Sequence, residues 1–91
     1  MIDRRLSITG RVQNVSYRDW FVREASGIGL AGWVRNRRDG SVEAYVRGSE
    51  EAVAAIVAAA RQGSPAARVD SVVVEPTPPE VVEGFERRAT L

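Results

Sequence analysis

Apolar and polar residues alternate along four stretches of the chain, and this alternation predicts four β-strands. The first covers residues 4–10, where Leu6 and Ile8 are expected to face a core and Ser7 and Thr9 the solvent. The other predicted strands are residues 31–37, 41–47 and 69–75. The Arg38-Asp39-Gly40 segment joins the second strand to the third, and Asp-Gly favours a hairpin because it tolerates positive φ.

Two further stretches have the spacing of amphipathic helices. From Tyr17 onward, apolar and aromatic residues recur at helical spacing as far as Ile28, and a glycine on each side of Ile28 is typical of a helix end. Ser49 is a capping residue for the second helix, which carries acidic residues in its first turn and ends near Gly63.

The order of these elements, β-α-β-β-α-β, predicts a ferredoxin-like α+β sandwich. Two right-handed crossovers place both helices on one face of a mixed, mostly antiparallel sheet with strand order 4-1-3-2. Residues 85–90 are expected to add a short fifth strand at an edge. No linker, repeat or low-complexity tract interrupts the chain, so we expect residues 1–91 to form a single domain.

Composition excludes several kinds of chemistry. Cysteine and histidine are absent, which leaves no thiolate nucleophile, imidazole base or Cys/His zinc site. All thirteen basic residues are arginine, and twelve acids balance them to a net charge of +1, so no basic field for nucleic acid is expected. No apolar run reaches membrane-spanning length, and no signal peptide is recognisable. We therefore expect a cytoplasmic protein that binds neither membranes nor nucleic acid.

The stretch between the first strand and the first helix is a candidate anion site. Residues 10–18 read GRVQNVSYR, so a strand turns through a loop into a helix whose first N–H groups lack partners within the helix. Arg18 closes this stretch, and its guanidinium can hold a phosphate group through two parallel hydrogen bonds. The alternative is that Arg18 pairs with a nearby acid such as Asp19 or Glu24, as surface arginines commonly do.

A second block, residues 29–43, reads GLAGWVRNRRDGSVE. Together the two blocks resemble the two signature motifs of the acylphosphatase family. The resemblance continues through residues 63–69 to Phe85, and so covers essentially the whole chain.

This resemblance implies a hydrolase that splits the carboxyl–phosphate bond of an acyl phosphate into a carboxylate and inorganic phosphate. It assigns Arg18 to phosphate binding and Asn36 to positioning the attacking water, without a metal or cofactor. The backbone N–H groups expected to complete the phosphate-binding loop belong to Val12, Gln13, Asn14, Val15, Ser16 and Tyr17. The product phosphate is expected to inhibit competitively, and the protein is expected to be a monomer.

The chain departs from the family pattern at two positions. Asn14 stands where the family usually has glycine, and Asn is among the few other residues that tolerate left-handed backbone. Arg87, two residues after Phe85, stands where an apolar residue is usual, which weakens the prediction of the last strand.

Other interpretations remain open at this level. Asn36 could simply flank the following turn, and Arg35, Arg37 and Arg38 are expected to form a solvated face. The chain could be a non-catalytic module that binds phosphate or carbamoyl phosphate, like the related domain of hydrogenase-maturation carbamoyltransferases. An RNA-binding module of the same fold is disfavoured, because its central strands need aromatic residues and only Tyr45 is available.

Overall fold

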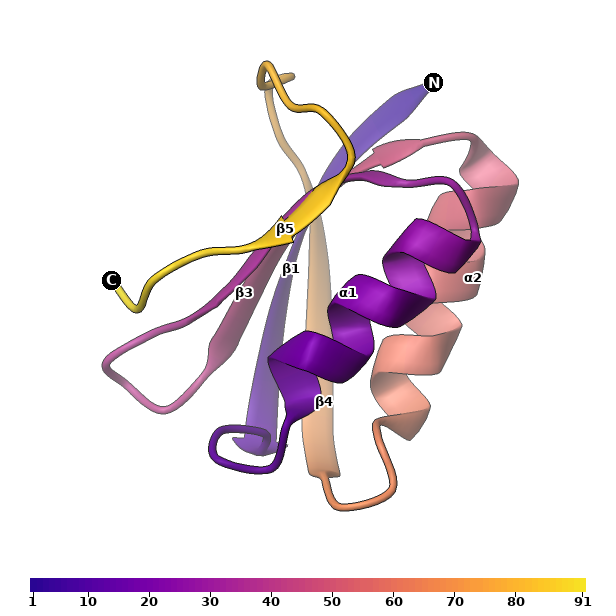
Figure 1. Ribbon diagram of the computed structural model, residues 1–91. Helices are drawn as coiled ribbons and strands as arrows, with labels where there is room; N and C mark the ends of the chain where they lie inside the picture. The colour runs from indigo at the N-terminus through magenta and orange to yellow at the C-terminus, as the bar shows by residue number, and fades with distance from the viewer.

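The computed structural model describes all 91 residues, which form five strands and two helices (Figure 1). In chain order the elements are β1 (Ile2–Arg11), α1 (Tyr17–Gly27), β2 (Ala31–Asn36), β3 (Val42–Gly48), α2 (Glu50–Gln62), β4 (Arg68–Pro76) and β5 (Phe85–Arg87). The strands form one sheet in the order β4-β1-β3-β2-β5. The predicted order 4-1-3-2 is therefore confirmed, with β5 added beside β2.

β1 lies between β4 and β3 and pairs antiparallel with both. Leu6 and Ile8 are fully buried and belong to a core cluster of 14 residues drawn from the sheet and both helices, as the alternation predicts. β5 pairs with β2 in parallel over only three residues, from Gly32 opposite Phe85 to Val34 opposite Arg87. The fifth strand is thus present but shorter than residues 85–90.

The two helices begin in different ways. Ser49 caps α2 with its side chain, because its Oγ accepts a hydrogen bond from the Ala52 N–H at 3.1 Å. Ser16 precedes α1 in the left-handed conformation and makes no such bond. The start of α1 is held instead by Tyr17, whose buried hydroxyl donates to the Ala60 carbonyl of α2 at 3.0 Å. This burial raises the pKa of Tyr17, so its hydroxyl stays protonated.

Gly32 allows β2 and β3 to approach closely. Its φ is +145°, and a Cβ at this position would clash with the backbone carbonyl oxygen of Tyr45. A side chain there would therefore force apart the pair of strands that carries Asn36 to its position.

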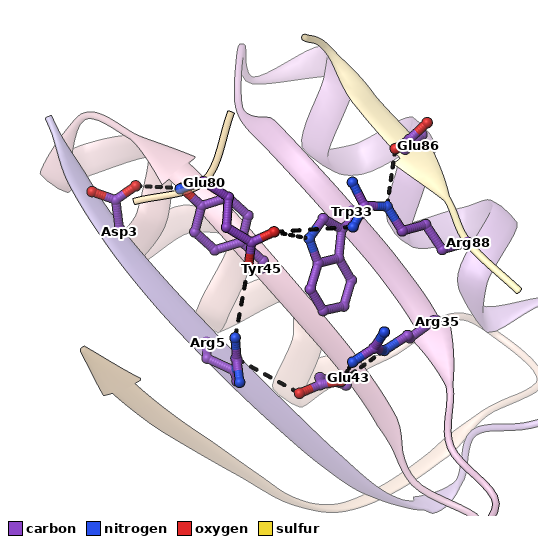
Figure 2. A network of polar contacts seen from close by, with 9 residues as sticks. All are labelled: Asp3, Arg5, Trp33, Arg35, Glu43, Tyr45, Glu80, Glu86 and Arg88. Carbon is purple, nitrogen blue, oxygen red and sulfur yellow. Dashed lines mark hydrogen bonds and ion pairs between the residues drawn. The ribbon is translucent and has the colours of Figure 1, made fainter. Parts of the chain in front are cut away.

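The sheet face opposite the helices carries a polar and aromatic network (Figure 2). The Trp33 indole donates to Glu80 Oε1 at 2.9 Å, and the Tyr45 hydroxyl accepts from the Glu80 N–H at 3.0 Å. Trp33 and Tyr45 are buried although they face away from both helices. The segment after β4 thus closes over this face, which accounts for its shielding from solvent.

On the same face, the carboxylate of Glu43 forms ion pairs with three arginines. Its buried carboxylate lies 2.7 Å from Arg35 Nη2, 3.2 Å from Arg37 Nη1 and 3.6 Å from Arg5 Nε. The prediction that Arg35 is solvated is therefore wrong, because Glu43 and the Trp33 ring together bury most of its side chain. Arg38 remains exposed in the hairpin turn, as predicted.

Candidate active site

A cavity of about 340 Å³ lies at the end of the sheet where β1 leads into α1. Four parts of the chain enclose it: the loop of residues 12–16, the first turn of α1, the last residue of β2, and β5. Its lining residues are Val12, Asn14, Ser16, Tyr17, Arg18, Asp19, Asn36 and Arg87. The two signature blocks, which are separate in the sequence, therefore meet at one site.

Six of the eight residues predicted for the site line this cavity, and Gln13 and Val15 are the exceptions. Val15 is half-buried and packs against the hydrophobic core. Gln13 turns toward the β2–β3 hairpin, where its Nε2 donates to the carbonyl oxygens of Arg37 at 2.7 Å and Ser41 at 2.8 Å. The side chain of Gln13 thus ties the loop to the strand that carries Asn36.

The loop backbone has the shape of an anion-binding nest. Asn14 and Ser16 both have φ of +60°, whereas Gln13 and Val15 do not have positive φ. Backbone that alternates in this way directs successive N–H groups into one concavity. No acceptor within the chain takes the N–H groups of residues 12–16, so these donors remain available to a ligand.

Arg18 is half-buried at the second position of α1 and forms no ion pair. Its one hydrogen bond is long, 3.5 Å from Nη1 to the carbonyl oxygen of Arg88. The alternative that Arg18 pairs with Asp19 or Glu24 is therefore wrong, because Asp19 pairs with Arg87 instead. A guanidinium that protrudes into a cavity without an acidic partner is suited to bind an anion.

Asn36 is the last residue of β2 and is 8% exposed. Its side-chain oxygen Oδ1 is buried without any hydrogen-bond partner. A buried polar group without a hydrogen-bond partner lowers the free energy of unfolding by about 1–3 kcal/mol and is unusual in a folded protein. Asn36 lines the same cavity as Arg18, which brings this unpaired group and the guanidinium to one site.

The side chain of Asn36 takes no part in the hydrogen bonds that close the neighbouring hairpin turn. The Arg37 N–H donates to the Ser41 carbonyl at 2.8 Å, and Asp39 Oδ1 accepts from the Ser41 N–H and hydroxyl at 2.9 and 2.6 Å. The two bonds from Ser41 hold the pKa of Asp39 below its usual value. The interpretation of Asn36 as a turn-flanking residue is therefore unnecessary.

Sequence reasoning did not assign Asp19 or Arg87 to the site. The two side chains form an ion pair at the cavity, with 2.8 Å between Arg87 Nη1 and Asp19 Oδ1. They lie 68 residues apart in the chain, and only the pairing of β5 with β2 brings them together. The sequence feature that pointed to Arg87 was its departure from the family pattern, which usually has an apolar residue at this position.

Potential metal ligands are not grouped in this structure. No set of three or more Asp, Glu, His or Cys side chains is arranged to hold a metal ion. No helix is both long and apolar enough to cross a membrane.

Comparison with known proteins gives a consistent result. Residues 4–87 match the acylphosphatase family. The chain is 50% identical over 90 residues to an acylphosphatase of Rhizorhabdus wittichii, which aligns over 99% of this chain and 91% of that protein. The crystal structure of acylphosphatase from Bacillus subtilis matches with a TM-score of 0.92 at 37% identity, covering 97% of this chain and 99% of that one. HypF from T. kodakarensis matches with a TM-score of 0.87 at 27% identity, but this chain covers only 12% of it.

Proposed function

Because the chain belongs to the acylphosphatase family, we propose that it hydrolyses acyl phosphates in the cavity between the 12–16 loop, α1 and β2. Relatives about 50% identical over nearly the whole chain are acylphosphatases, and this protein is an acylphosphatase enzyme. The likeness to HypF covers a small part of that protein and does not favour a module without turnover. The observation that carries the location of the site is the meeting of Asn36 with Arg18, which has no acidic partner, at the cavity beneath the loop.

The phosphoryl group binds in the loop. The free N–H groups of residues 12–16, with that of Tyr17 in the first turn of α1, donate to its oxygens, and Arg18 adds two charge-assisted bonds. These donors are fixed before the reaction, because Gln13 ties the loop to the hairpin and Tyr17 ties α1 to α2. Fixed donors stabilise the charge that develops on the equatorial oxygens in the transition state.

Asn36 orients the attacking water. Its side-chain amide forms a hydrogen bond with the water, which keeps an oxygen lone pair free to attack phosphorus. The new bond forms between the water oxygen and phosphorus, the phosphorus–oxygen bond to the acyl group breaks, and its electron pair leaves on the carboxylate. An amide is not a strong base, so a phosphoryl oxygen takes the proton of the water.

A carboxylate is a good leaving group that needs no protonation, and the reaction as proposed uses neither a metal nor a cofactor. We expect hydrolysis of benzoyl phosphate, followed by the change in absorbance, to proceed unchanged in EDTA. Inorganic phosphate is expected to inhibit competitively, because it fits the same loop. A strict requirement for added Mg²⁺ would contradict this mechanism and point to another kind of phosphatase.

We further propose that residues 1–91 act as one domain, as a monomer in the cytoplasm. The buried apolar residues form a single core cluster. All residues of the proposed site come from one chain, so catalysis needs no second copy.

Asn14 offers a test of the loop backbone. Asn14→Gly is expected to leave the enzyme active, with the free energy of unfolding changed by no more than about 1 kcal/mol, because relief of the positive φ opposes the added entropy of the unfolded chain. Asn14→Val is expected to lower both kcat/KM and the urea midpoint, since a β-branched residue resists φ of +60°. Wild-type values for Asn14→Val in both measurements would show that the left-handed conformation at this position has no role.

A further inference from the structure

Arg87 lies at the mouth of the cavity. Its side chain is 51% exposed and that of its partner Asp19 is 52% exposed, whereas Asn36 is 8% exposed. Phe85, two residues earlier on β5, packs against Phe21 of α1 with 5.6 Å between ring centroids. Because alternate residues of a strand share a face, Arg87 also points toward α1 and the cavity.

The fold does not require an arginine at this position. A half-exposed ion pair contributes little to stability. The neighbouring Arg88 differs, because it stacks 5.1 Å from the centroid of the Trp33 ring and binds Glu86 at 3.0 Å on the opposite face of the sheet (Figure 2). Arg88 therefore has a full structural role, and Arg87 does not.

The guanidinium of Arg87 has most of its binding capacity unused. It donates one N–H to Asp19, and a guanidinium carries five. The four remaining N–H groups can bind a second carboxylate while the pair with Asp19 stays intact. Glu43 and its three arginines show the converse arrangement in this same protein, with one acid shared among several cations.

We propose that Arg87 determines substrate specificity by binding a negative charge on the acyl group. This inference rests on the proposed function of the cavity. The preferred substrates are then acyl phosphates whose acyl part carries a second anionic group, such as a carboxylate. Asp19 occupies part of the Arg87 guanidinium and so competes with the acyl anion for it.

Two features assign Arg87 to the acyl group and not to the phosphoryl group. The phosphoryl group already has its donors in the free N–H groups of the 12–16 loop and in Arg18, which leaves Arg87 for the acyl group. The attacking water is held at the buried Asn36, so the acyl group leaves toward the mouth, where the exposed cation is Arg87.

The test compares two substrates that differ by one remote charge, benzoyl phosphate and 4-carboxybenzoyl phosphate. The quantity measured is the ratio of kcat/KM for the carboxylated substrate to that for the plain one. Arg87→Gln is expected to lower this ratio roughly fivefold, because it removes one charge-assisted hydrogen bond at a partly exposed site. Arg23→Gln is the matched control, because Arg23 is an exposed arginine of α1 that forms no ion pair and lies outside the cavity, and the ratio should stay at the wild-type value.

Asp19→Asn provides a second test in which Arg87 is retained. Removing the competing carboxylate is expected to raise the ratio, and raising the salt concentration is expected to lower it in the wild type by screening the contact. An unchanged ratio in Arg87→Gln, or an equal fall in Arg23→Gln, would overturn the inference while leaving the acylphosphatase site in place. A wild-type protein that hydrolyses neither substrate would overturn the proposed function and this inference together.

Discussion

Arg18→Ala is expected to lower kcat/KM for benzoyl phosphate roughly 100- to 1,000-fold, the usual cost of losing a preorganised donor to transition-state charge. The fold should survive, because Arg18 makes no ion pair and its one hydrogen bond is 3.5 Å long. Arg18→Lys is expected to recover little, since an ammonium group cannot reproduce two parallel bonds. The measurements are steady-state kinetics together with the urea midpoint.

Arg23→Ala is the matched control for this prediction. Arg23 lies on the same helix, is exposed, and forms no ion pair, so its removal changes charge equally without touching the cavity. Near-wild-type activity in either Arg18 variant would remove Arg18 from the mechanism. A comparable loss in Arg23→Ala would indicate that the overall charge of the protein, and not the position of Arg18, governs the rate.

Asn36→Ala is expected to lower kcat on the order of 100-fold, as misplacement of a reacting group commonly does. Its effect on inhibition by inorganic phosphate should be much smaller, because the proposed partner of Asn36 is water. The urea midpoint should not fall, since the deleted amide has a buried oxygen with no partner to lose. If Asn36→Ala weakened phosphate inhibition as much as Arg18→Ala, the water-positioning role would be wrong.

Most of the fold was predictable because its elements have local signals. The alternation of apolar and polar residues predicted the strands, and the Asp39-Gly40 pair predicted the hairpin. Ser49 predicted the start of α2. The end of the last strand was not predictable from such signals. After Arg87 the chain keeps only separate hydrogen bonds to β2, from the N–H of Arg88 to Val34 and from that of Leu91 to Asn36.

The site was predictable only in part, for physical reasons that differ among residues. The left-handed conformation of Asn14 was expected, because asparagine tolerates it. That of Ser16 was not, since serine has no comparable preference and the sequence shows an ordinary capping residue. The pairing of Arg87 with Asp19 depends on where an edge strand docks, which no local pattern specifies.

The docking of residues 85–91 links the activity of the enzyme to a weak part of its structure. Through Arg88 this segment contacts Arg18, through Leu91 it contacts the backbone of Asn36, and through Arg87 it holds Asp19. Yet β5 is a three-residue strand at the sheet edge, and edge elements open locally at a lower free energy than the core. Activity therefore depends on a local equilibrium that is distinct from global unfolding. Mild denaturation would release this segment and inactivate the enzyme while the central strands remain folded.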